Sequence, residues 1–187
     1  LEPLAGPVER AAEMIAAALA AGHKLMLCGN GGSAADSQHL AAEFTGRFIK
    51  DRRPLAAMAL STDSSALTCI ANDYSFDDVF SRQVLGLGTT GDCLLAISTS
   101  GNSRNVVRAV EAARGLGMHS IGLLGRDGGQ LAALCELAIV VPSNTTAFIA
   151  RLAGKLRSSP RATSAPVPTT SASPNGISAC HASRMSW

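Results

Sequence analysis

The sequence predicts an α/β fold in which helices flank a doubly wound parallel sheet. Five short segments are apolar on both faces, which is typical of strands buried inside a parallel sheet. Segments with helical periodicity lie between them, and this alternation is the second observation. Thirdly, glycine, serine and threonine follow several of the apolar segments, where the carboxyl ends of parallel strands present ligand-binding loops.

The elements follow one another in a regular order. The apolar segments predict strands at residues 24–29, 55–60, 92–98, 119–125 and 136–141. The alanine-rich start of the chain predicts a helix over residues 9–21, because Met14, Ile15 and Leu19 share one face and Gly22 ends the pattern. Helical spacing predicts further helices at residues 33–44, 64–73, 76–85, 103–117 and 129–135.

Composition limits the classes of partner. The chain has 187 residues, 47% of them hydrophobic and 16% charged, with a formal net charge of +2. So small a charge, spread along the chain, indicates no nucleic acid and no membrane as partner. The first four of the five cysteines lie in or beside apolar runs without paired spacing, so we expect buried free thiols and a cytoplasmic location.

The first loop joins the strand at 24–29 to the next helix. Gly29, Gly31 and Gly32 permit a tight turn, Ser33 is placed to cap the helix, and the backbone amides can hold an anion. The same residues satisfy the dinucleotide pattern G-x-G-x-x-G/A, with Asp63 as the ribose-binding acid after the next strand. A dinucleotide-binding oxidoreductase is therefore one alternative.

The second loop is rich in hydroxyl groups. Ser98, Thr99, Ser100, Gly101, Asn102 and Ser103 follow the strand at 92–98 and open the next helix. Hydroxyls and backbone N–H groups at a helix N-terminus bind the oxygens of a phosphate ester. The loop therefore predicts a monophosphate site.

One helix carries a histidine and a glutamate four residues apart. This spacing puts His39 and Glu43 on one helical face, within reach of a common ion or substrate. Both lie near the first loop, which favours a functional role.

Together these segments resemble the sugar isomerase (SIS) domain family and, within it, the bacterial phosphoheptose (sedoheptulose 7-phosphate) isomerases. The resemblance rests on CGNGGSAADSQHLAAEFTGRF, ANDYSFDDVFSRQV, GDCLLAISTSGNSRNVVRAV, GLLGRDGG and VPSNTTA, between Leu25 and about Ala147. It implies conversion of sedoheptulose 7-phosphate into D-glycero-D-manno-heptose 7-phosphate, for the heptose of lipopolysaccharide. It also implies a homotetramer and one zinc ion per subunit.

The same resemblance assigns residues to roles. Glu43 would be catalytic, and His39 with Glu43 would bind zinc, while the family supplies a further glutamine and histidine from a C-terminal helix. The serine loop would hold the phosphate, and the other substrate-binding residues would line the sugar site. The full substrate-binding set is Asn30, Gly31, Gly32, Ser33, Arg47, Asn72, Asp73, Ser98, Thr99, Ser100 and Ser103.

After about Ala147 the sequence departs from this family. Gln130 is the last glutamine, and the last histidine, His181, lies in a segment rich in serine and proline. We therefore expect a SIS domain over residues 1–157, with incomplete terminal helices, and a disordered tail over 158–187. The abrupt change suggests a shifted reading frame, and an inactive enzyme if the tail is genuine.

Another alternative belongs to a different class of protein. A non-catalytic SIS adaptor that binds the bacterial replication initiator shares the glycine loop and the serine loop. The adaptor lacks the family glutamate, whereas Glu43 followed by Thr45, Gly46 and Arg47 matches the isomerases. The isomerase is the reading that these residues favour.

Overall fold

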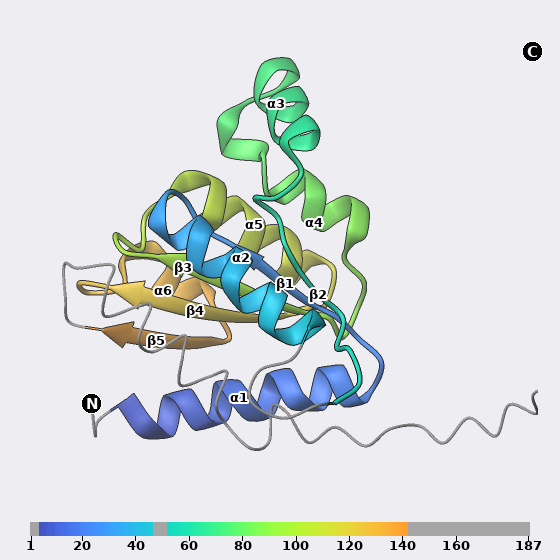
Figure 1. Cartoon of the computed structure of the whole chain (residues 1–187). Helices are drawn as coiled ribbons and strands as arrows, with labels where there is room; N and C mark the ends of the chain where they lie inside the picture. Colours follow the sequence, from blue (N-terminus) through green and yellow to red (C-terminus); the bar gives the residue numbers. More distant parts are fainter. Residues whose placement is uncertain (1–3, 47–51, 142–187) are drawn as a thin grey trace, which may run out of the picture.

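The computed structural model describes residues 4–46 and 52–141, and within these ranges five parallel strands form one sheet (Figure 1). The strands are β1 (Leu25–Cys28), β2 (Ala57–Ala59), β3 (Cys93–Ser98), β4 (His119–Gly125) and β5 (Leu137–Val141). Their spatial order is β2-β1-β3-β4-β5. This is the flavodoxin-like order, in which the strand order reverses between β1 and β3. The predicted fold class is confirmed.

Helices cover both faces of the sheet. They are α1 (Ala5–Ala20), α2 (Gly32–Thr45), α3 (Ser64–Asp73), α4 (Ser81–Leu87), α5 (Arg104–Gly115) and α6 (Gly129–Leu134), with a 3-10 helix η2 (Phe76–Asp78). Since alternate strand residues point to opposite faces, Leu25 and Leu27 pack with α1 and α2, while Met26 and Cys28 pack with α4, α5 and α6. The result is a three-layer sandwich.

A buried carboxylate ties the amino ends of the central strands together. Asp92, only 1% exposed, precedes β3 and accepts hydrogen bonds from the Lys24 ammonium at 2.6 Å and the Lys24 backbone N–H at 3.0 Å. Thr89 donates to it through its N–H at 2.8 Å and its hydroxyl at 2.9 Å. Burial alone would raise the pKa of Asp92, but the hydrogen bonds from Lys24 and Thr89 outweigh it and hold the pKa below its ordinary value.

One predicted helix is divided. Residues 76–85 were expected to form a single helix, but η2 ends at Asp78 and α4 begins at Ser81. The Ser75 hydroxyl accepts a hydrogen bond from the Asp77 N–H at 3.0 Å and so stabilises a tighter turn. Val79 and Phe80, which follow that turn, are buried in the core.

Two further expectations need correction. The first helix begins at Ala5 rather than Glu9, because Pro7 lies in the first turn, where its missing N–H costs no hydrogen bond. Cys28, Cys93 and Cys135 are buried free thiols as predicted, but Cys69 is exposed. It lies on α3, whose residues are all at least partly exposed and which stands apart from the layered body (Figure 1).

The described ranges carry no helix with the length and apolar character that a membrane span requires. The predicted boundary at residue 157 and the tail over 158–187 lie outside the described residues.

Candidate functional site

Two loops lie side by side at the edge of the sheet where the strand order reverses. β1 and β3 are neighbouring parallel strands, with Cys28 paired to Ala96, so both carboxyl ends reach the same edge. The glycine loop (residues 29–33) follows β1, and the serine loop (residues 98–103) begins at the end of β3. This is the place at which open α/β sheets bind ligands.

The glycine loop is shaped by close contacts. A Cβ atom on Gly29 would lie 2.7 Å from the Ser33 Cβ and 2.9 Å from the Ile97 carbonyl oxygen, so a larger residue does not fit there. Gly31 has a φ of +56° and occupies the N-cap position of α2, a position predicted for Ser33. Ser33 instead lies buried within the first turn, its carbonyl oxygen accepting a hydrogen bond from the Ser37 hydroxyl at 2.8 Å.

The serine loop gathers three hydroxyl groups. The Ser98 Oγ lies 3.2 Å from the Ser103 Oγ and 3.5 Å from the Ser100 Oγ, and it accepts a hydrogen bond from the Gly101 N–H at 3.1 Å. Ser103 is the N-cap residue of α5, a helix of 12 residues. Hydroxyl donors beside the N-terminus of this helix form a site suited to a phosphate, with Thr99 partly exposed in the same loop.

A neighbouring turn supports the serine loop from behind. Gly101 has a φ of +66°, and a Cβ atom there would lie 2.0 Å from the Gly128 carbonyl oxygen. The Asn102 side-chain oxygen accepts a hydrogen bond from the Gln130 N–H at 3.0 Å, and the Gly101 carbonyl accepts one from the Leu131 N–H at 3.1 Å. These hydrogen bonds therefore hold the serine loop against the start of α6.

A pair of amide side chains connects the two loops. Asn30 and Asn105 each donate an N–H to the oxygen of the other, both at 2.9 Å. Asn105 lies in the first turn of α5 and is 3% exposed. Sequence reasoning missed it; the available signal was its place on the apolar face of the predicted helix, four residues before Ala109 and eight before Ala113.

His39 and Glu43 lie together on α2 as predicted. The His39 Nε2 is 3.8 Å from the Glu43 Oε1, and the two side chains are 65% and 20% exposed. Asp36, one turn earlier, has a buried Oδ2 to which no described group hydrogen-bonds. Burial raises the pKa of Asp36, and the charge of His39 opposes that shift.

An arginine that sequence reasoning missed caps the C-terminal end of α2. Arg52 donates to the Glu43 carbonyl at 2.6 Å and to the Phe44 carbonyl at 2.9 Å. Guanidinium groups satisfy the last carbonyls of a helix and interact favourably with its dipole. Arg52 therefore helps to hold the end of the helix that carries Glu43.

His39 and Glu43 fit a partial metal site. A protein zinc ion usually has about four ligands drawn from histidine, cysteine and carboxylate side chains. Within residues 4–46 and 52–141, no group of three or more His, Cys, Asp or Glu side chains is arranged to hold a metal ion. If both bound one zinc ion, these two side chains would supply two of about four ligands.

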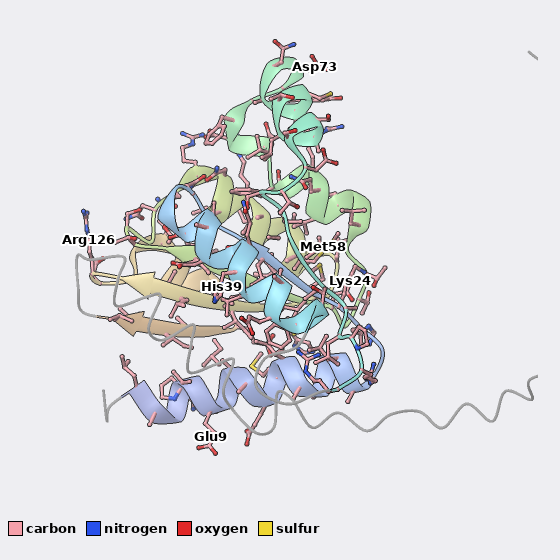
Figure 2. All side chains as sticks on the ribbon, in the orientation of Figure 1. Glu9, Lys24, His39, Met58, Asp73 and Arg126 are labelled. Carbon is pink, nitrogen blue, oxygen red and sulfur yellow. The ribbon has the colours of Figure 1, made fainter. Side chains whose placement is uncertain are left out.

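The remaining predicted site residues do not join this cluster. Asn72 and Asp73 are exposed at the end of α3, where the Asn72 amide donates to Asp73 at 2.8 Å. Figure 2 shows Asp73 at the tip of the projecting helix, far from His39 on α2. Arg47 lies outside the described residues.

The structure gives Asp63, the proposed ribose-binding acid of the dinucleotide alternative, a different role. The Asp63 side chain accepts a hydrogen bond from the Ala66 N–H at 2.9 Å, so it caps α3.

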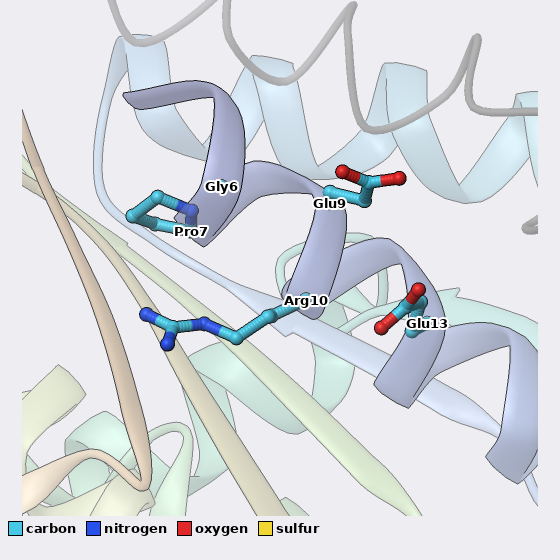
Figure 3. A pocket seen from close by; sticks show the side chains of 5 residues that line it. All are labelled: Gly6, Pro7, Glu9, Arg10 and Glu13. Carbon is cyan, nitrogen blue, oxygen red and sulfur yellow. The ribbon is translucent and has the colours of Figure 1, made fainter. Parts of the chain in front are cut away.

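A separate depression on α1 is lined by Gly6, Pro7, Glu9, Arg10 and Glu13 (Figure 3), all of which lie outside the loops at the strand ends. The glycine and serine loops remain the candidate site.

Comparison with known proteins gives consistent matches. A family model described as SIS domain matches residues 1–125. A phosphoheptose isomerase of Aliarcobacter butzleri is 55% identical over 146 residues, which cover 78% of this chain and 77% of that protein. One of Rhodospirillum rubrum is 55% identical over 145 residues, with coverage of 78% and 77%.

Solved structures agree with these matches. The phosphoheptose isomerase of Neisseria gonorrhoeae has a TM-score of 0.76 and 50% identity, over 82% of this chain and 84% of that chain. The corresponding structure from Francisella tularensis has a TM-score of 0.77 and 35% identity, with the same coverage. These relatives carry the name of an isomerase, which favours an enzyme over the adaptor.

Proposed function

The chain belongs to the SIS domain family and, within it, to the phosphoheptose isomerases, and from that premise we propose that it converts sedoheptulose 7-phosphate into D-glycero-D-manno-heptose 7-phosphate. The observation that carries the proposal is the cluster of Ser98, Ser100 and Ser103 hydroxyls at the N-terminus of α5. A sugar phosphate needs an anion site of this kind beside a polar site for its other end. A cytoplasmic role in supplying heptose for lipopolysaccharide fits this reaction.

The reaction moves a carbonyl group between adjacent carbons through an enediol. A base takes the proton from the hydroxyl-bearing carbon beside the carbonyl; the C–H electrons form the carbon–carbon double bond, and the carbonyl π electrons move to the oxygen, which gains a proton. The hydroxyl on the first carbon then loses its proton and becomes the new carbonyl, while the electrons of the carbon–carbon double bond take up a proton at the former carbonyl carbon. We assign this transfer to Glu43, whose side chain is 20% exposed beside His39. Partial burial of this kind limits competition from water for the carboxylate.

Substrate binding is assigned to the two loops. Ser98, Thr99, Ser100 and Ser103 would hold the phosphate, while Asn30, Gly31, Gly32 and Ser33 would face the sugar. Asn72, Asp73 and Arg47 remain proposed sugar-site residues by resemblance. The separation of α3 from the loops means that Asn72 and Asp73 would have to reach the sugar by a movement of α3 or from another copy of the chain.

We propose zinc as the cofactor, held in part by His39 and Glu43. When bound, zinc acts as a Lewis acid that polarises the substrate carbonyl. Metal analysis of the purified chain, with His39→Ala as the comparison, tests the assignment. A zinc content unchanged by this substitution would exclude His39 as a ligand.

Assembly into a homotetramer is also proposed. Apolar side chains are exposed on η2 and α4 and just after α3, including Tyr74 at 59%, Phe76 at 61% and Leu85 at 59%. Exposed apolar groups of this size are typical of surfaces that pack against another chain. Sedimentation of the purified chain measures the oligomeric state, and a monomer at micromolar concentration would contradict the proposal.

The central experiment combines turnover with binding. We expect Ser100→Ala and Ser103→Ala each to weaken sedoheptulose 7-phosphate binding by about 10- to 150-fold, because a hydrogen bond to a charged group contributes about 1.5 to 3 kcal/mol. Ser65→Ala, an exposed serine on α3, is the matched control and should leave affinity unchanged. Calorimetry measures the affinities, and unchanged binding in both loop variants would reject the phosphate site.

Turnover separates the isomerase from the other readings. When the residues after Ala147 are replaced by a family-type helix, the chain should isomerise sedoheptulose 7-phosphate, and Glu43→Gln in that chain should abolish the reaction while phosphate binding persists, because the serine loop lies on different elements. The family's further glutamine and histidine ligands have no counterpart after Gln130 apart from His181. We therefore expect the chain with its own residues after Ala147 to be nearly inactive, and turnover at an ordinary enzyme rate would contradict this expectation. Activity retained by the Glu43→Gln variant would exclude Glu43 as the base.

A further inference from the structure

The reciprocal hydrogen bonds between Asn30 and Asn105 join two elements that are 75 residues apart in the sequence. Each amide uses one N–H and its oxygen on the other, both at 2.9 Å. Asn105 is 3% exposed, so loss of its partner would leave a buried amide unsatisfied. The pair therefore strongly favours one relative position of the two elements.

Asn105 is the fixed member of this pair. It lies two residues after Ser103, in a helix whose next residues, Val106 and Val107, are buried in the core. The position of its amide is consequently set by the same helix turn that follows the serine loop. Any group attached to Asn105 is held at a constant distance from the phosphate site.

Asn30 is the member that needs holding. It lies between Gly29, which packs closely on Ile97, and Gly31, whose φ of +56° favours glycine. Its backbone carbonyl accepts a hydrogen bond from the Ser33 N–H at 3.0 Å, while its side chain is oriented by the pair with Asn105. The amide pair is a long-range side-chain restraint on this loop. It links the glycine loop to α5 rather than to its own helix, α2.

We propose that Asn105 is a positioning residue that keeps the glycine loop in register with the serine loop, so that one sugar phosphate contacts both loops at once. This inference rests on the proposed function, in which the serine loop binds the phosphate and the glycine loop faces the sugar. Binding through two connected contacts is strong only when the distance between the two sites matches the ligand. A change in the relative position of the two loops therefore weakens binding of the sugar phosphate more than binding of a ligand that touches one loop.

Inorganic phosphate and sedoheptulose 7-phosphate test this difference. In Asn105→Ala and in Asn105→Leu, which keeps the side-chain volume without adding a charge, we expect the affinity for inorganic phosphate to stay within about twofold of the unmodified chain, because neither change touches the serine loop. The affinity for sedoheptulose 7-phosphate should fall by about tenfold or more. Calorimetry on the full chain gives both dissociation constants, and their ratio is the decisive quantity.

The matched control is Ser120→Ala. Ser120 is also buried, and its hydroxyl accepts a hydrogen bond from the Glu136 N–H at 3.0 Å, at the amino end of β4. Losing this bond should lower stability without changing the ratio of the two affinities. An Asn105 variant that behaves like the Ser120 variant would show that Asn105 is merely structural and would overturn the inference.

The outcomes separate this inference from the proposed function. If the unmodified chain binds sedoheptulose 7-phosphate no more tightly than inorganic phosphate, the proposed substrate is wrong and the inference falls with it. If the chain prefers the sugar phosphate and the Asn105 variants keep that preference, only the inference is wrong.

A measurement on the unmodified chain covers the case in which the variants do not fold. Side-chain amide signals of Asn30 and Asn105 in nitrogen-15 spectra should show slow hydrogen exchange both without ligand and with bound sedoheptulose 7-phosphate. Rapid exchange at Asn105, or opening of the pair when the ligand binds, would overturn the inference.

Discussion

Three glycine-to-alanine substitutions measure how closely the serine loop packs on its supporting turn. Gly101 has a φ of +66°, and a Cβ atom there would lie 2.0 Å from the Gly128 carbonyl oxygen. Gly22 also has a positive φ, of +90°, but a Cβ atom there would meet no described atom within 4 Å. Gly115 is the last residue of α5 and is equally open, without a positive φ. The same substitution thus introduces backbone strain and a clash at Gly101, backbone strain alone at Gly22, and neither at Gly115.

The three sites predict effects of different size and sign. Gly115→Ala should raise the free energy of unfolding by about 0.5 to 1 kcal/mol, since alanine favours the helix. Gly22→Ala should lower it by about 1 to 2 kcal/mol through left-handed strain. Gly101→Ala adds a clash, because the gap to Gly128 must widen from 2.0 Å to at least 3.0 Å. Overpacking costs about 1 to 3 kcal/mol, so about 2 to 5 kcal/mol is expected in total.

Urea unfolding and calorimetry with inorganic phosphate measure the outcome. Gly101→Ala should also weaken phosphate binding by about tenfold or more, because moving the loop by about 1 Å misplaces its donors. Gly22→Ala and Gly115→Ala should leave this affinity unchanged. The reasoning fails if Gly101→Ala is no more destabilising than Gly22→Ala, or if it binds phosphate normally.

Two further predictions concern acidic residues outside the loops. Asp92→Asn should lower the free energy of unfolding by about 3 kcal/mol at neutral pH, because Lys24 loses its buried partner. Folding lowers the pKa of Asp92, so its contribution to stability is present above the unfolded pKa of about 3.9 and is lost as pH falls through the folded pKa. Urea unfolding across acidic pH should therefore show the difference in free energy of unfolding between the unmodified chain and Asp92→Asn disappearing. A difference that stays constant with pH would contradict this prediction. Asp63→Ala should destabilise α3 by about 1 kcal/mol, because the helix loses its N-cap. Amide hydrogen exchange in α3 should become faster, while the affinity for phosphate stays the same. Weakened phosphate binding would instead place Asp63 in the site.

The fold and the placement of both loops could be predicted because they depend on local pattern and on a general rule of topology. Strands 24–29 and 92–98 were recognisable from apolar runs, and parallel strands must end at one edge of the sheet. Ser98, Ser100 and Ser103 followed from their position at the start of a helix. Whether their hydroxyls also bind phosphate, as the resemblance implies, is what the alanine substitutions test.

The contacts between the loops could not be predicted, because each needs two distant segments in known relative positions. The pairing of Asn30 with Asn105, and of Asn102 with the Gln130 N–H, depends on how the helices pack on the sheet. Capping was misplaced for a similar reason. Ser33 has the residue type of an N-cap, but the backbone turns at Gly31, with a φ of +56°, and the helix begins directly after it at Gly32.

Asp73 shows why a residue's motif does not determine its surroundings. Its segment was predicted correctly as a helix, yet α3 leaves the layered body and exposes both Asp73 and Cys69. The α3–η2 segment is attached to the site side of the sheet through Asp77, which forms an ion pair with Arg104 at 2.8 Å. Arg104 is the residue directly after Ser103, so the projecting segment and the serine loop meet at the first turn of α5. The start of this one helix therefore connects the serine loop to both the glycine loop, through Asn105, and the segment that carries Asp73.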